Sequence, residues 1–147
     1  MASKGIVKKV LIKNKKNTKK YKNDKSTKIK RTNLNMLSTN ADGLKYKAED
    51  LKNKIRYFKS AIFAVQQTQF QRKGKFRLQN YHIFEAIRKS KEKGGSMLGI
   101  HVNLNPVLIA EYGDTFELIV VEIEIAKKHI RILTGYGPQD LKLGSSR

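Results

Sequence analysis

Three side chains that carry amide or carboxylate oxygens stand where the chain is expected to leave a strand. Asn40 and Asp42 lie two positions apart just before a glycine, and Gln67 ends the apolar run 61–67. Magnesium prefers oxygen ligands of this kind, and a Tyr hydroxyl such as that of Tyr136 can hydrogen-bond a phosphate oxygen. Each residue also has a plain structural interpretation: Asn-x-Asp-Gly is good turn chemistry, Gln67 can be a polar strand end, and Tyr136 a half-buried strand aromatic.

The second chemical feature is a lysine-rich tail. Residues 1–31 hold 13 of the 32 Lys and Arg residues against one acid, so they carry +12 of the net charge of +20. A basic arm of this type binds nucleic acid or acidic surfaces, or serves as a nuclear import signal. The tail has little apolar material to bury and no sustained period, so we expect it to be disordered and to contact nucleic acid. The residues expected to make that contact are Lys15, Lys16, Lys19 and Lys20.

A shorter basic stretch lies in the middle of the chain. Arg72, Lys73 and Lys75 stand between Phe70 and Phe76. Cations interleaved with aromatic rings suit the backbone and bases of nucleic acid, and we assign these three cations to nucleic-acid binding. A solvated hairpin explains the same residues, so both interpretations stay open.

Composition excludes several classes of protein. The chain has no cysteine, which excludes disulfides, thiolate catalysis and Cys-based zinc sites. No run approaches the ~18 apolar residues that span a bilayer, and the N-terminus lacks the apolar core of a secretory signal. We therefore expect a nuclear or cytoplasmic protein that is not secreted and has no membrane partner. The oligomeric state stays open.

The polar residues must be positioned by elements that the residue pattern indicates. A helix is expected at 47–59, where Leu51, Ile55 and Phe58 form one apolar stripe. The expected strands are 34–40, 61–67, 96–102 and 107–110, with one or two more within 76–86. Since strands dominate after one helix, we expect an α/β fold with a mainly antiparallel sheet, in one domain that covers residues 32–147.

The clearest pattern is a hairpin over residues 115–136. Its apolar residues Leu118 and Val120 alternate with polar or outward-facing ones, and the alternation resumes at Ile123 after a slip near Val121. Period-two alternation on both sides of a short turn is typical of paired antiparallel strands. On this pattern Leu118 and Val120 face the core.

Four segments, in order, resemble the endonuclease/exonuclease/phosphatase superfamily, and most closely the endonuclease domain of LINE-type non-LTR retrotransposons. They are STNADGL at 38–44, AIFAVQQTQF at 61–70, GGSMLGIHV at 94–102 and GYGPQ at 135–139. Together they extend from Leu34 to about Gln139. The resemblance implies a partial sandwich of that superfamily, with few helices, preceded by the basic tail.

The same resemblance implies a role for each polar residue. Asn40 and Gln67 match positions that bind or place a magnesium ion, and Asp42 matches an acidic residue beside them. Tyr136 matches a Tyr that reaches the scissile phosphate. Asn40, Asp42 and Tyr136 are thus the implied catalytic residues. The activity implied for the intact domain is magnesium-dependent phosphodiester hydrolysis, with DNA as the expected partner.

Two departures from the superfamily pattern argue against cleavage by this chain. Gln67 stands where the superfamily has Glu, and a neutral amide holds a divalent cation weakly. The Asp-x-Asn and Asp-His segments that follow the Tyr-x-Pro strand in the superfamily have no counterpart before Arg147, so a general base is missing. We expect a truncated, inactive nuclease domain. The alternatives are a non-catalytic basic nucleic-acid-binding protein and a remnant of a mobile element.

The implied site also makes a prediction about the sheet. Side chains that share one metal site must lie within a few ångströms of a common point. Leu37 and Val65 should therefore belong to neighbouring strands that end at the same edge, which would bring Asn40 and Gln67 together.

Overall fold

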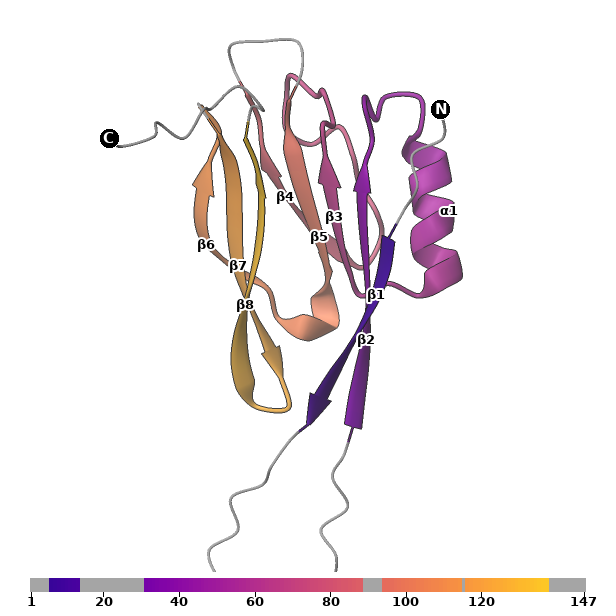
Figure 1. Cartoon of the computed structure of the whole chain (residues 1–147), viewed down its shortest axis with the longest axis vertical. Coiled ribbons are helices and arrows are strands. Elements are labelled where there is room, and N and C mark those ends of the chain that lie inside the picture. The colour runs from indigo at the N-terminus through magenta and orange to yellow at the C-terminus, as the bar shows by residue number, and fades with distance from the viewer. Residues whose placement is uncertain (1–5, 14–30, 89–93, 115, 138–147) are drawn as a thin grey trace, which may run out of the picture.

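Strands dominate the computed structural model, which describes residues 6–13, 31–88, 94–114 and 116–137. No helix in these ranges is long and apolar enough to cross a membrane. The elements in chain order (Figure 1) are β1 (Ile6–Lys13), β2 (Arg31–Asn40), α1 (Ala48–Phe58), β3 (Ile62–Gln66), β4 (Tyr81–Ala86), β5 (Ser96–His101), the 3-10 turn η1 (Val102–Leu104), β6 (Val107–Tyr112), β7 (Glu117–Ile125) and β8 (Lys128–Tyr136).

Five strands form the larger sheet, in the order β1-β2-β3-β5-β4. Strands β2 and β3 run parallel, with Asn40 opposite Gln66, whereas every other neighbouring pair in this sheet is antiparallel. The parallel pair is joined through α1, because two parallel strands need a crossover connection rather than a tight turn. Since β2 and β3 run in the same direction, their carboxyl ends meet at one edge of the sheet.

Three antiparallel strands form the smaller sheet, in the order β6-β7-β8. Alternate residues of β3 divide between two cores, since Ile62 packs with the apolar residues of β7 whereas Phe63 packs with those of α1. The protein therefore has three layers, with the larger sheet between α1 and the smaller sheet, as Figure 1 shows. This arrangement is the α/β sandwich that the sequence predicts.

The helix α1 forms where its apolar residues share one face. Leu51 and Ile55, four positions apart, are buried against the larger sheet. Phe58 is 37% exposed, so the predicted apolar stripe is confirmed for its first two members and ends before the last turn. Lys59 then adopts a left-handed conformation, with φ of 48°, and ends the helix.

Strand β7 corrects one detail of the predicted hairpin. The hairpin itself forms between β7 and β8. The buried residues of β7 follow every second position without a slip: Glu117, Ile119, Val121, Ile123 and Ile125. Leu118 and Val120, expected on the core side, are only partly buried because they lie on the opposite face of the strand. Because the alternation is uninterrupted, the side chain of Glu117 is buried in the interior.

Two further predictions differ from the structure. Residues 6–13, expected within a disordered tail, form β1 and pair antiparallel with β2. The Ile and Val residues of this stretch suit a strand, although its charge favoured a solvated arm. Residues 76–80 lie outside any strand, so only the second half of 76–86 is extended, as β4.

The close packing between the paired strands β3 and β5 requires a glycine at position 99. Gly99 lies opposite Phe63 in the register of the two strands, and a Cβ atom at Gly99 would overlap the fully buried ring of Phe63. We expect Gly99→Ala to lower the free energy of unfolding by about 3 kcal/mol, measured by urea denaturation. The matched control is Gly137→Ala, since a Cβ at Gly137 would meet nothing within 4 Å. Equal stability of the two variants would contradict this packing.

Candidate functional site

The carboxyl ends of β2 and β3 bring the predicted polar residues together. Backbone pairing continues beyond the strands, because Ala41 N donates to Gln66 O at 2.9 Å and Gly43 N donates to Gln67 O at 2.8 Å. The stretch that carries Asn40 and Asp42 therefore runs beside the stretch that carries Gln67.

The sheet prediction for Leu37 and Val65 is confirmed. The two residues lie on the neighbouring strands β2 and β3, and both belong to the core that packs against α1. The two side chains therefore lie on the same face of the sheet, the face that α1 covers.

Asn40 and Asp42 form a turn at this edge. Asn40 Oδ1 accepts a hydrogen bond from Asp42 N at 3.1 Å, and the backbone at Asp42 is left-handed, with φ of 45°. Gln69 Nε2 donates to Asp42 Oδ1 at 3.2 Å and holds the carboxylate in place. The turn interpretation is therefore correct, and the same turn presents both exposed side chains at the end of the sheet.

Gln67 and Tyr136 are in direct contact across the two sheets. Gln67 Nε2 donates to Tyr136 Oη at 2.5 Å. The preceding residue, Gln66, makes a second hydrogen bond between the sheets, because its Nε2 donates to Thr134 Oγ1 at 3.0 Å. These two hydrogen bonds link the end of β3 to the end of β8, so the larger and the smaller sheet share this edge.

A buried ion pair beside Tyr136 was not predicted from the sequence. Arg88 Nη2 donates to Glu117 Oε2 at 3.0 Å, and Glu117 is fully buried. Gly95 N donates to the second oxygen, Glu117 Oε1, at 2.9 Å. The Arg88 guanidinium carbon also lies 5.8 Å from the centre of the Tyr136 ring. The Arg88–Glu117 pair therefore lies next to Tyr136, which is also opposite Glu117 in the register of β7 and β8.

The signal for this pair is present in the β7 sequence. Glu117 falls in the same alternate positions as Ile119 and Val121, which are buried. A carboxylate in that series requires a cation and further hydrogen-bond donors, because an unpaired buried charge is very costly. Gly95, with φ of 89°, provides one donor at a position where a Cβ would overlap the Thr68 hydroxyl.

The residues at this edge do not fit a resident magnesium ion. Asn40 Oδ1 accepts the hydrogen bond of its own turn, the Asp42 carboxylate accepts from Gln69, and the Gln67 amide donates to Tyr136. Within the described residues, no group of three or more His, Asp or Glu residues could hold a metal ion. A divalent cation would meet one engaged carboxylate and two neutral amides, which is a weak ligand set.

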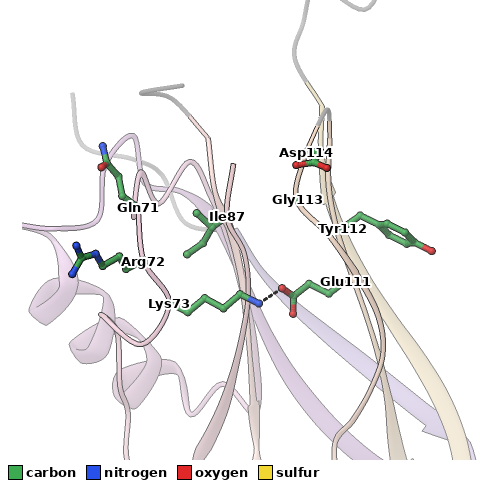
Figure 2. Close-up of a pocket in the computed structure, with 8 residues that line it drawn as sticks. All are labelled: Gln71, Arg72, Lys73, Ile87, Glu111, Tyr112, Gly113 and Asp114. Atoms are coloured by element: carbon green, nitrogen blue, oxygen red, sulfur yellow. Dashed lines mark hydrogen bonds and ion pairs between the residues drawn. The ribbon is translucent and has the colours of Figure 1, made fainter. Parts of the chain in front are cut away.

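The basic stretch between Phe70 and Phe76 is a loop, here called the basic loop. Its three cations, Arg72, Lys73 and Lys75, are in different surroundings. Lys73 Nζ forms an ion pair with Glu111 Oε1, and Figure 2 shows Lys73 extending toward Glu111 while Arg72 extends the opposite way. Arg72 and Lys75 are exposed, and neither has an ion-pair partner among the described residues. The four assigned tail residues lie outside the described part of the chain: Lys15, Lys16, Lys19 and Lys20.

The two aromatic residues of this loop also differ. Phe76 is buried in the core beneath α1, so its ring is not available to a ligand. Phe70 is half-buried at the margin of the same core.

Gly74 of the basic loop contacts the carboxyl group of Glu85 on β4. Burial raises the pKa of this carboxyl, and the hydrogen bond from Gly74 N, 2.7 Å long, opposes that rise.

Comparison with known proteins confirms the fold. No protein-family model matches the chain, and no curated protein matches it. The endonuclease domain of TRAS1, a telomere-specific non-LTR retrotransposon, matches with a TM-score of 0.55 and 16% identity, over 71% of this chain and 46% of that one. Humanized D. rerio TDP2, changed by 14 mutations, matches with a TM-score of 0.51 and 15% identity, over 69% of this chain and 46% of that one.

The chain therefore spans about half the length of each of these two structures. Over that span it has the fold that the four sequence segments predict, a partial endonuclease/exonuclease/phosphatase-like sandwich. At these levels of identity the likeness shows the fold, and the chemistry has to be argued from the residues of this chain.

Proposed function

We propose that this chain, which has a partial endonuclease/exonuclease/phosphatase-like fold, binds the phosphodiester backbone of DNA at the shared edge of its two sheets without cleaving it. The edge consists of the turn at Asn40 and Asp42, Gln67 directly after β3, and Tyr136 at the end of β8. Magnesium-dependent hydrolysis is the activity that we propose for an intact domain of this fold with a carboxylate at position 67.

The observation that supports this proposal is the hydrogen bond from Gln67 to Tyr136. Because the Gln67 amide donates to Tyr136 Oη, the hydroxyl oxygen acts as an acceptor and its own hydrogen is free to point elsewhere. A phosphate oxygen is a strong acceptor for that hydrogen. A glutamate at position 67 would instead accept the hydroxyl hydrogen, unless a cation occupied the carboxylate. Gln67 therefore suits a Tyr that donates to phosphate in the absence of metal.

Charge supports a nucleic-acid ligand. The chain has a net charge of +20. Attraction of this kind supplies most of the non-specific affinity of proteins for DNA and decreases steeply with salt. The TRAS1 domain, which shares the fold, is an endonuclease domain by its description, and we propose DNA as the ligand of this chain by analogy.

Replacing Tyr136 by Phe tests this proposal. We expect Tyr136→Phe to weaken binding of double-stranded DNA in EDTA by about tenfold, because one hydrogen bond to a charged acceptor is lost while the ring is kept. The measurement is a fluorescence-anisotropy titration at fixed salt. The matched control is Tyr57→Phe, since Tyr57 is an exposed residue of α1 that is not part of the shared edge. Equal affinities of the two variants would refute the assignment of Tyr136.

A further inference from the structure

A cavity of about 490 Å³ lies beside the shared edge, between the start of α1 and the basic loop. Its volume falls in the range of sites that hold one small ligand. Three of its lining residues are cations, Lys45, Arg72 and Lys75, and none is an acid. The other lining residues are Ala48, Gln69, Phe70 and Gln71.

The three cations of the cavity are free to bind an anion. In the described part of the chain, none of them forms an ion pair, and Lys45 lies over the ring of exposed Tyr46 at 5.2 Å. Lys73 of the same loop differs, because it is paired with Glu111 on the other side of the loop (Figure 2). The pocket on the other side of the loop also borders Arg72, but its lining includes the acids Glu111 and Asp114, whereas no acid lines this cavity.

The cavity is connected rigidly to the shared edge through Gln69. Its backbone is left-handed, with φ of 58°, and Gln69 N donates to Gly94 O at 2.8 Å. Its side chain donates to Asp42, the acid of the Asn40 turn. If a strand of nucleic acid contacts Tyr136 and the Asn40 turn, the cavity is therefore next to it and can receive a neighbouring nucleotide of the same strand.

We propose that this cavity holds one unpaired nucleotide, whose base stacks on Phe70 and whose phosphate lies among Lys45, Arg72 and Lys75. The amides of Gln69 and Gln71 offer hydrogen bonds to the base. Stacking on an aromatic ring combined with a basic groove is the general way in which proteins bind single strands. This inference rests on the proposed function, because the nucleotide belongs to the strand bound at the shared edge.

The experiment separates stacking from charge. The probe is a short single-stranded oligonucleotide that carries the fluorescent base 2-aminopurine, titrated with the full chain in EDTA. We expect Phe70→Leu to weaken binding about tenfold, to reduce the quenching of 2-aminopurine, and to leave the salt dependence unchanged. An oligonucleotide with abasic sites in place of its bases should bind wild type and Phe70→Leu equally, because it has nothing to stack.

The charge half of the proposal has its own matched variants. Lys45→Gln, Arg72→Gln and Lys75→Gln should each reduce the slope of log K against log salt by about 0.7, as expected for one lost contact to a single-strand phosphate. Lys73→Gln removes the same charge from the same loop and should change the slope by much less, because Lys73 is paired with Glu111.

The outcomes are distinguishable from failure of the proposed function. If the chain binds no DNA at all, the proposed function is wrong. If it binds single strands but Phe70→Leu and Lys73→Gln behave alike, the cavity is not the nucleotide site. Equal sensitivity of blunt duplex and single strand to Phe70→Leu would also overturn the proposal, since a paired base cannot stack on Phe70.

Discussion

Supercoiled plasmid incubated with the purified 147-residue chain and magnesium is expected to stay supercoiled. Gln67 cannot act as a charged ligand, and the polar groups around it are already engaged with Tyr136, Gln69 and the Asn40 turn. Without a tightly held cation and a positioned general base, hydrolysis loses both charge stabilisation and water activation. The general base alone typically contributes about 10²–10⁴-fold. The rate of nicking should therefore be indistinguishable from that of a reaction without protein.

The variant Gln67→Glu separates metal binding from cleavage. We expect it to bind magnesium more tightly than the wild type in a calorimetric titration, because a carboxylate replaces an amide beside Asp42. We expect no gain in nicking, since a carboxylate that binds magnesium does not also supply a general base. Magnesium-dependent nicking by the wild type that disappears in Asn40→Ala would show that this interpretation of the site is wrong.

Removing the cation of the buried ion pair should produce the largest loss of stability. Among the described residues, Arg88→Met leaves the fully buried Glu117 carboxylate with the Gly95 N–H as its one remaining donor. Leaving one charge of a buried pair uncompensated costs about 3–5 kcal/mol, and we expect a loss of this size in the free energy of unfolding from urea denaturation. The result would show that the pair holds β7 to the strand ends of the larger sheet.

Two further variants test whether the loss comes from the buried charge. Arg131→Met breaks an exposed ion pair with Glu122 and should change stability by less than about 1 kcal/mol. The double variant Arg88→Met with Glu117→Gln should recover much of the loss, because a neutral amide can still accept from Gly95 N. A double variant no more stable than Arg88→Met would mean that lost packing, rather than the charge of Glu117, causes the effect.

Local periodicity was sufficient to predict most of the fold. The apolar spacing of Leu51 and Ile55 predicts α1, and the alternating residues on both sides of the turn near Lys127 predict the hairpin of β7 and β8. The convergence of Asn40 with the end of β3 also followed from the sequence. These features depend on residues close together in the chain, or on the general rule that parallel strands end at the same edge.

The missed features depend on partners far apart in the chain. The alternation in β7 signals the burial of Glu117, but its partner Arg88 lies 29 positions earlier, and only the assembled fold brings the two together. The predicted pattern placed Leu118 on the core side and needed a slip near Val121, whereas in the structure Glu117 takes the first buried position of an unbroken alternation. Similarly, the sequence gives Arg72 and Lys73 the same character, and only the position of Glu111 distinguishes them.

The most direct test of the proposed phosphodiester site is to map DNA binding residue by residue. Amide chemical shifts of the isotopically labelled chain would be followed by nuclear magnetic resonance during titration with a DNA oligonucleotide in EDTA. We predict that the shifts change most at Asn40, Gln67 and Tyr136, at the shared edge of the sheets, and remain unchanged at the far hairpin turn of Ala126 and Lys127. Changes confined to the hairpin turn or to the lysine-rich tail, with none at the shared edge, would contradict the proposed site.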